Sequence, residues 1–359
     1  MLRGPIKLSV VAGLVCAATL FLSISCAPKS LSTRRAEAEA SPYIVSSCWF
    51  KETGGLNENG VFVWNIEEVL AGKKPELRLL WRGGEGGIPK ARISWDGRHI
   101  AVATWNPERD AQNILLVEPG KNSEEWLTSD AAEQRCLSWL DDHRLLCLRL
   151  PHDRTPVRLQ VWDVARRRLV REFSLPGMER CAVPQVSPNV VALLVWKDGR
   201  PHSIALLDPS SFAVRGTYTY PFAAAPPVPV DSQFIVDEKG RFFFVINAED
   251  PESPLGNPER TAIYMAMPDD QQYELMPRLL VALPEEAGRH GSLCVWRDRY
   301  LIFTEVPRKE LAAASFTVNV LDLETGRRHQ FVPEWEGKKI LLINHALITR
   351  KAASELGLP

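Results

Sequence analysis

The stretch 93–103, Ile-Ser-Trp-Asp-Gly-Arg-His-Ile-Ala-Val-Ala, decides the fold because the chain repeats its pattern along most of its length. A short apolar strand runs into a tight polar turn, and a second, strongly apolar strand follows. Related phrases occur at residues 137–148, 185–194, 234–245 and 294–303, with a shorter one at 341–343. A pattern that returns every 45 to 60 residues, roughly, with only strand-type content predicts a repeat protein built from small sheets.

A second signature marks the end of each unit's third strand, where an acidic or amide residue follows an aliphatic residue or tryptophan. Such a short polar side chain accepts a hydrogen bond from the backbone two residues on, which opens the turn to a fourth strand. The region 228–283 departs from this pattern, because Met267 stands there. The residues that follow the pattern are Asn65, Glu118, Asp163, Asp208 and Asp322.

Four strands per unit and six units predict an all-β chain folded as a six-bladed β-propeller. Blade one has strands at 43–47, 61–64 and 77–81 but lacks its first strand. We therefore expect the C-terminal strand at 340–343 to pair with the N-terminal blade and close the ring, which removes exposed sheet edges. Seven blades remain the alternative, because the long fifth region could hide a unit. Blades two to six are expected at 90–130, 133–176, 180–222, 228–283 and 290–335.

Residues 94–98 (Ser-Trp-Asp-Gly-Arg) with 100–102 (Ile-Ala-Val) resemble the Ser-Pro-Asp-Gly-x-x-Ile-Ala phrase of TolB-like and WD-repeat-like propellers of bacterial envelopes. Trp95 replaces the proline of that phrase, and residues 141–142 (Asp-Asp) replace its Asp-Gly in the next copy. The resemblance covers about 42–349 as a loose repeat. It implies a propeller fold, whereas many functions share such a fold.

The N-terminus has the pattern of a targeting signal, with Arg3 and Lys7 before an uncharged apolar run at 8–24. Residues 22–29 (Leu-Ser-Ile-Ser-Cys-Ala-Pro-Lys) resemble a bacterial lipoprotein signal, although Ser23 stands where leucine is usual. In that family the cysteine, here Cys26, is acylated. The resemblance implies export and a lipid anchor on the periplasmic or outer side of a bacterial membrane. Simple signal cleavage and an uncleaved anchor are the alternatives.

These readings divide the chain into four parts. We expect a signal peptide at 1–25, a flexible tether at 26–41 after a lipidated Cys26, the propeller domain at 42–350 and a C-terminal tail at 351–359.

Composition and cysteine spacing exclude several classes of partner. The net charge is −1, and acidic and basic residues are mixed along the chain. A nucleic-acid surface needs clustered Lys and Arg, so we expect no nucleic acid partner. Neither the cysteines nor the histidines have metal-ligand spacing, so we expect no metal and no cofactor. Cys136 and Cys147 would form a hydrogen-bonded cross-strand pair, a poor geometry for a disulfide, and we leave that bridge open.

Motifs for catalysis do not occur in the sequence: neither Gly-x-Ser-x-Gly, nor His-Glu-x-x-His, nor a phosphate-binding loop. His99 and His143 fall in first-hairpin turns, where we expect them to be exposed, and His345 is expected to close the last hairpin. The sequence therefore predicts no catalytic residue, and we predict that the chain is not an enzyme. The alternative is a propeller enzyme or ligand-binding protein that uses the central channel.

Tryptophans divide into two groups by position. Trp95, Trp139 and Trp296 occupy one place in three units, which favours packing between neighbouring blades. Trp49 and Trp105 instead end second strands and open polar loops, on the face that also carries the connections between blades. Exposed Trp and Arg are frequent interface anchors. The candidate partner-binding face consists of Trp49, Trp105, Arg109, Asp250, Glu252 and Arg260.

The sequence thus predicts a membrane-anchored, exported propeller lipoprotein. We expect it to act as a non-catalytic binding or scaffold module in the cell envelope, with an envelope protein or a glycan as its partner.

Overall fold

The computed structural model describes residues 40–51, 57–85, 90–121, 123–150, 157–174, 180–182, 190–197, 200–222, 234–246, 262–269, 274–282, 287–307 and 316–359. The expected signal peptide and Cys26 lie outside these residues. In the described part, neither helix has the length and apolar character needed to cross a membrane.

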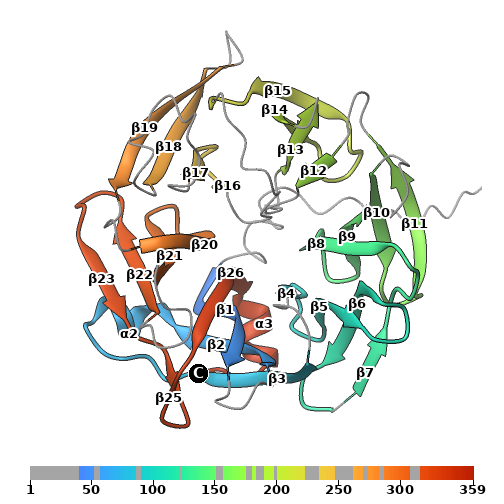
Figure 1. Ribbon diagram of the computed structural model, residues 1–359, viewed down its shortest axis with the longest axis horizontal. Helices are drawn as coiled ribbons and strands as arrows, with labels where there is room; N and C mark the ends of the chain where they lie inside the picture. Colours follow the sequence, from blue (N-terminus) through green and yellow to red (C-terminus); the bar gives the residue numbers. More distant parts are fainter. Residues whose placement is uncertain are drawn as a thin grey trace, which may run out of the picture.

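The described strands form six four-stranded sheets arranged in a ring (Figure 1), which confirms the predicted six-bladed propeller. Blade one orders β26 (Leu341–Thr349), β1 (Ala40–Lys51), β2 (Asn57–Asn65) and β3 (Arg78–Glu85) from the axis outward. Blade two has β4 (Lys90–Ile93), β5 (Ile100–Asn106), β6 (Ala111–Glu118) and β7 (Ser123–Trp126), and blade three has β8 (Glu133–Trp139), β9 (Arg144–Leu150), β10 (Arg158–Asp163) and β11 (Arg168–Phe173).

Blades four to six repeat this order. They contain β12 (Arg180–Ala182), β13 (Val191–Lys197), β14 (Arg200–Leu207) and β15 (Val214–Thr219); β16 (Phe234–Val236), β17 (Phe242–Ile246), β18 (Ala262–Asp269) and β19 (Glu274–Ala282); and β20 (Ala287–Trp296), β21 (Tyr300–Pro307), β22 (Thr317–Asp322) and β23 (Arg328–Phe331). A small hairpin, β24 (Glu334–Trp335) with β25 (Lys338–Lys339), and the helices α2 (Ile66–Leu70) and α3 (Arg350–Glu355) complete the described elements.

Ring closure occurs where the sequence predicted it. Strand β26 pairs antiparallel with β1, with Leu342 opposite Cys48 and Ile343 opposite Ser47. The first blade therefore takes its innermost strand from the C-terminal end of the described fold, and the two ends of the propeller hold each other. Each described blade consequently has four strands, and the short inner edges of the six sheets face the axis of the ring.

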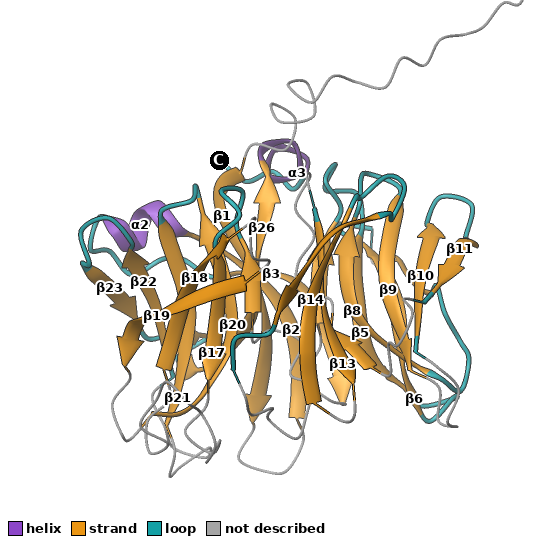
Figure 2. Ribbon diagram, turned by 90° about the horizontal axis from the view of Figure 1, so that it is seen from above, coloured by secondary structure: helices purple, strands orange, loops and turns teal. Residues whose placement is uncertain are grey.

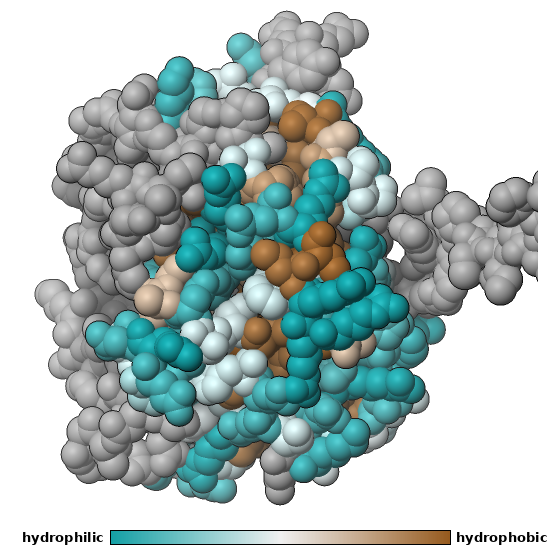
Figure 3. All heavy atoms as spheres, turned by 90° about the vertical axis from the view of Figure 1, so that its right-hand side faces the viewer, coloured by the Kyte–Doolittle hydropathy of each residue, from teal (hydrophilic) through white to brown (hydrophobic). Residues whose placement is uncertain are grey.

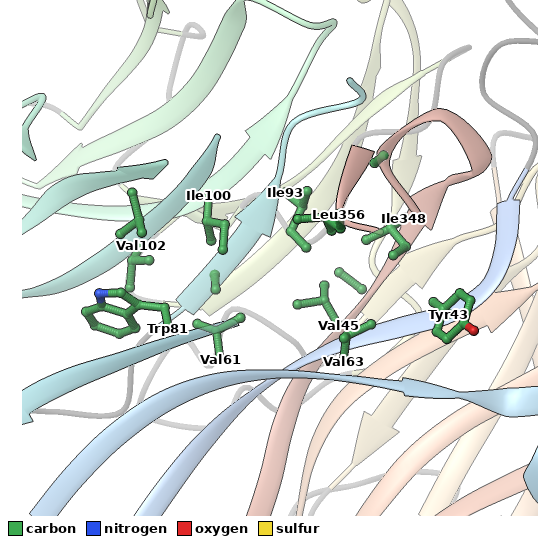
Figure 4. Close-up of a cluster of buried hydrophobic side chains, with 14 of the residues drawn as sticks. Tyr43, Val45, Val61, Val63, Trp81, Ile93, Ile100, Val102, Ile348 and Leu356 are labelled. Atoms are coloured by element: carbon green, nitrogen blue, oxygen red, sulfur yellow. The ribbon is translucent and has the colours of Figure 1, made fainter. Parts of the chain in front are cut away.

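The core lies in the seams between blades. In the seam of blades one and two, Val61 and Val63 of β2 face Ile100 and Val102 of β5 (Figure 4). The run 100–103 is fully buried on both faces because blades cover each side of the second strand. A strand covered on both faces has a continuous apolar run instead of an alternating one, which is why second strands gave the clearest signal in the sequence.

Two of the repeated tryptophans join neighbouring blades by hydrogen bonds as well as by packing. The indole Nε1 of Trp139 in blade three donates to the carbonyl of Arg92 in blade two at 2.9 Å. In the same way, Trp296 of blade six donates to the carbonyl of Ser41 in blade one at 2.7 Å. Both side chains are buried. These contacts confirm the predicted packing role for Trp139 and Trp296.

Third-strand ends form the predicted turns. The Oδ1 atom of Asn65 accepts from the Glu67 amide at 2.9 Å, and that of Asp322 accepts from the Glu324 amide at 3.0 Å. Asp208 does the same with the Ser210 amide at 2.9 Å. Since these bonds span two residues, local sequence alone determines them.

The C-terminal segment, which the sequence assigned to a tail from residue 351, contributes to the fold through α3. Thr349 caps the helix by accepting from the Ala352 amide at 3.0 Å. Ala352, Ala353 and Leu356 are buried in the seam of blades one and two. The helix covers the first turn of blade two, where Gly97 has φ +79°. An added Cβ on Gly97 would lie 2.8 Å from the backbone of Ala352.

Cys147 is a buried thiol that takes part in no disulfide, so the bridge to Cys136 that the sequence left open does not form. A register shift between Arg135 and Ser138 interrupts the pairing of β8 with β9, so the expected pairing of the two cysteines does not form. The Cys147 thiol instead lies 3.4 Å from Oε1 of Gln134.

Candidate functional site

The propeller has two different faces. We call the face with the turns between first and second strands, together with both helices, the upper face (Figure 2). The lower face is the opposite one, where second strands connect to third strands and where β1 and β5 end. The sequence predicted a binding face on this lower side.

Trp105 lies on the lower face near the end of β5. Its side chain is 41% exposed, whereas the five residues from Ile100 to Thr104 are buried. It pairs across the sheet with Gln112 of β6. An indole so exposed at the end of a buried strand adds to the apolar surface that a partner can cover.

Arg109 lies on the turn that follows Trp105. This turn is fixed by Asn106, whose Oδ1 accepts from the Glu108 amide at 3.0 Å and whose carbonyl accepts from the Arg109 amide at 3.2 Å. Asp110 closes the turn with φ +52°. The structure therefore places Arg109 and Trp105 on one short, hydrogen-bonded turn, with residues 107–110 exposed.

A polar group that sequence reasoning missed lies behind this turn. Nδ2 of Asn113 donates to the carbonyl of Asp130 at 3.2 Å, and the Asp130 carboxylate forms an ion pair with Nε of Arg149 at 3.0 Å. Gln134 donates to the same carboxylate at 3.5 Å. An asparagine at the start of the apolar run 114–117 was the only local signal. Asp130 lies 17 residues further along the chain, on the connection between β7 and β8, and Arg149 belongs to blade three, so this group could not be recognised from the sequence.

The other residues of the predicted face are not placed by the structure. Trp49 belongs to β1, and only its backbone is described. Asp250, Glu252 and Arg260 lie outside the described residues, as does Cys26. Of the predicted set, the structure brings together Trp105 and Arg109.

His345 is the main residue whose surroundings the sequence misjudged. It does not close a hairpin; it lies within β26 and is 2% exposed. Its Nδ1 lies 2.7 Å from Oγ of Ser46, and its Nε2 lies 2.7 Å from Oγ1 of Thr304. The expectation was wrong because β26 continues the innermost strand beyond residue 343 and carries this imidazole into the seam of blades six and one.

The hydrogen bonds around His345 assign its protonation state. Thr304 donates its hydroxyl proton to the carbonyl of Leu342 at 2.6 Å, so its oxygen accepts from Nε2–H of His345. Trp64 donates to Ser46 at 2.8 Å, and Ser46 in turn donates to Nδ1. Each donor in this chain meets one acceptor only if the imidazole is neutral. Burial, with a smaller contribution from Arg92, lowers the pKa of His345 to about 3.

The upper face has a shallow cavity of about 170 Å³ at the seam of blades two and three, lined in part by His99, Glu118 and Arg167. Burial lowers the pKa of His99, while Glu118 and Asp96 act in the opposite direction. Glu118 already forms an ion pair with Lys121 at 2.6 Å, and Arg167 forms one with another lining residue. With its charges internally paired, this cavity is a weaker candidate than the lower face.

The outer rim of blades three and four shows separate apolar groups among hydrophilic ones (Figure 3). Leu169, Val170 and Val214 are the large exposed hydrophobic residues of the outer strands there. Single exposed hydrophobic residues are ordinary on protein surfaces. Among the described residues, no three His, Cys, Asp or Glu side chains are grouped so as to hold a metal ion.

Comparison with known proteins finds similar chains among solved structures. No family model matches the sequence, and no curated protein matches it. Among solved structures, TolB from Acinetobacter baumannii is 12% identical with a TM-score of 0.43, covering 86% of this chain and 80% of its own. Oligogalacturonate lyase from Vibrio parahaemolyticus is 11% identical with a TM-score of 0.45, covering 81% and 82%. Porphyromonas gingivalis dipeptidyl peptidase 4 is 14% identical with a TM-score of 0.39, covering 81% of this chain but only 52% of its own.

These structures correct one prediction from the sequence. We predicted that the chain is not an enzyme, yet propellers similar to it include a lyase and a peptidase. Absence of familiar catalytic motifs therefore does not exclude catalysis for a chain of this architecture. At such low identity and TM-score the likeness assigns no activity to this chain.

Proposed function

We propose that the chain is an exported, lipid-anchored propeller that binds a protein of the bacterial cell envelope through its lower face. One observation carries the proposal: Trp105 keeps 41% of its surface exposed at the end of a strand that is otherwise buried. Exposed tryptophan and arginine side chains are the commonest residues whose truncation abolishes protein binding. Trp105 lies near the end of β5 and Arg109 on the hydrogen-bonded turn that follows, so the backbone that carries both is already ordered before a partner arrives.

The surroundings of Trp105 fit an interface with an apolar centre and a polar rim. The turn residues Glu108, Arg109 and Asp110 are exposed next to the indole in the chain. Asp130 and Arg149 form a half-exposed ion pair at the seam of blades two and three. Both charge signs are present, which favours a partner with a mixed polar surface over a strongly charged polymer.

The entry point of the chain supports presentation of this face away from a membrane. Ala40 pairs with Thr349, the residue that caps α3, so β1 begins on the upper face. Ala40 follows Cys26 by 14 residues, a length that spans at most about 50 Å. The 12 residues of β1 alone rise about 40 Å. To put the lower face on the bilayer, the tether would have to run back along the height of the propeller at nearly full extension. A lipid on Cys26 would therefore hold the upper face toward the bilayer and leave the lower face accessible.

Replacing Trp105 by alanine is expected to reduce partner capture at least tenfold, because a buried aromatic anchor contributes about 2 kcal/mol or more to binding. We would crosslink the tagged protein in intact cells and identify captured proteins by mass spectrometry. Leu169→Ala is the matched control, since Leu169 is similarly exposed at 40% but lies on the outer rim. Equal capture by both variants would remove Trp105 from the interface, and capture of glycan alone would favour a glycan partner.

Replacing Cys26 by alanine is expected to release the protein from the membrane fraction, because Cys26, the first residue after the expected signal peptide, would carry the acyl chains. Fractionation of cells and metabolic labelling with a fatty-acid analogue measure this directly. Cys16→Ala is the control, since Cys16 lies within the expected signal peptide. Label that persists in the Cys26 variant would show that the anchor is wrongly assigned.

A further inference from the structure

Two buried asparagines beneath the Trp105 turn each have one amide atom without a protein partner among the described residues. Asn106 is 1% exposed and its Nδ2 has no acceptor, while Asn113 is 0% exposed and its Oδ1 has no donor. Buried polar atoms are almost always hydrogen-bonded. Two such atoms of complementary type in one short hairpin call for a common explanation.

The orientation of both amides is fixed, so exchanging the oxygen and nitrogen of either does not satisfy them. Oδ1 of Asn106 accepts from the Glu108 amide at 3.0 Å, which leaves Nδ2 as a donor. Nδ2 of Asn113 donates to the carbonyls of Asp130 at 3.2 Å and Ala111 at 3.4 Å, which leaves Oδ1 as an acceptor. The contacts that each amide already makes therefore identify Nδ2 of Asn106 as the unpaired donor and Oδ1 of Asn113 as the unpaired acceptor.

The strand register places the two side chains on one face at a diagonal. Asn106 pairs with Ala111, and Thr104 pairs with Asn113. Diagonal neighbours on an antiparallel pair have Cβ atoms about 7 Å apart. Two asparagine side chains at this separation can reach each other, yet neither Nδ2 of Asn106 nor Oδ1 of Asn113 has a protein partner. The two atoms therefore do not bond directly, and one atom placed between them can satisfy both.

Asn319 of blade six shows how the protein satisfies an asparagine in the same local arrangement elsewhere. Asn319 of β22 also donates its Nδ2 to the carbonyl two residues earlier, that of Thr317, at 3.2 Å. Its Oδ1 accepts from Nε of Arg328 at 2.7 Å. Blade two supplies no such donor to Asn113 among the described residues, so another molecule must take the place of the arginine.

We propose that a single buried water molecule bridges Asn106 and Asn113. It accepts from Nδ2 of Asn106 and donates to Oδ1 of Asn113. A cation is excluded by the Nδ2–H donor and an anion by the Oδ1 acceptor, whereas water serves both. Buried waters make about three hydrogen bonds. Asn59 of blade one is also buried and alternates along β2 with Val61 and Val63, which line the seam of blades one and two.

This water would connect the binding turn to the body of the propeller. Asn106 fixes the turn that carries Arg109, and Asn113 donates to the carbonyl of Asp130 on the connection between β7 and β8. The water thus links the turn to Asp130 although the side chains of Asn106 and Asn113 do not touch each other. Its role in presenting Trp105 rests on the proposed function, but its existence does not.

A high-resolution crystal structure of the soluble domain is the first test. We expect an electron-density peak within hydrogen-bond distance of both Nδ2 of Asn106 and Oδ1 of Asn113. Cross-relaxation between the Asn106 side-chain amide protons and water in NMR provides an independent readout. Direct contact between the two amides, or no peak and no cross-relaxation, would overturn the proposal.

Replacing Asn113 by valine tests the positioning role. Without the acceptor, we expect the Glu108 and Arg109 amide protons to exchange about fivefold faster, because the turn loses one of its supports. Asn319→Val is the matched control and should leave these two amides unchanged. If the Glu108 and Arg109 amide protons of the Asn113 variant exchange at the parent rate, the water does not support the turn. If they exchange faster but the variant still captures its partner normally, the proposed binding face is refuted and the water is not.

Discussion

Replacing His345 by alanine is expected to lower the free energy of unfolding by about 3 to 5 kcal/mol, because the change combines a cavity with two hydroxyls that lose a partner. Ser46 and Thr304 come from different blades, and both are fully buried. His345 therefore joins blade one to blade six at the point where the ring closes. Chemical denaturation measures the effect.

His143→Ala is the control for this variant, since His143 is exposed in a turn of blade three. We expect its unfolding midpoint to stay within about 0.5 kcal/mol of the parent protein. An equally small loss for His345→Ala would show that the seam rearranges and that the hydrogen-bond chain does not hold the ring closed.

The same residue makes stability depend on pH. An unfolded histidine has a pKa near 6.5, whereas burial lowers the pKa of His345 to about 3 in the folded protein. Between these values the unfolded chain binds the proton and the folded one does not. The contribution of the neutral form is therefore complete above about pH 6.5 and is lost as pH falls toward 3.

Linkage gives a loss of about 2.5 kcal/mol from this histidine between pH 7 and pH 4.5. His345→Gln keeps one donor and one acceptor but does not titrate, so its stability should fall less over this interval. Arg92 is the charged group that acts on His345, and it stays cationic throughout. If the free energy of unfolding falls equally with pH in the parent protein and in His345→Gln, His345 is not a neutral, buried histidine.

Replacing Gly97 by alanine is the second change for which we expect a large effect. An alanine at φ +79° costs about 1 to 2 kcal/mol from its backbone alone. Its Cβ would also lie 2.8 Å from both Cα and the carbonyl oxygen of Ala352, so α3 would have to move. We expect a total loss of about 4 kcal/mol or more, measured by denaturant unfolding.

Gly240 provides a matched control, since it has φ +75° in the corresponding turn of blade five and open space around it. Gly240→Ala should lower the free energy of unfolding by only about 1 to 2 kcal/mol, which is what alanine costs in this backbone conformation. A chain that ends at Thr349 supplies the decisive comparison, because it lacks α3. In that background Gly97→Ala and Gly240→Ala should cost the same, and a persisting difference would show that the helix is not the cause.

Local sequence was sufficient to predict the strands, their turns and the ring. The second strands are apolar on both faces, and Asn65, Asp208 and Asp322 bond to amides two residues away. Ring closure was also predictable, because an unmatched apolar strand at 340–343 could only complete the blade that lacked one. Trp105 was recognised by the same reasoning, as an aromatic residue at the junction of a strand and a polar loop.

Only the tertiary structure decided which polar residues are buried and what they bind. The partners of His345 are 41 and 299 residues away in the chain, and Ala352 meets Gly97 only because a helix after the last strand covers that turn. Strand and turn preferences depend on neighbours within a few residues, so the sequence by itself indicated a closed ring of six blades, with seven as the alternative, and the position of its exposed tryptophan. Burial and hydrogen bonding between blades depend on contacts that exist only once the ring has closed.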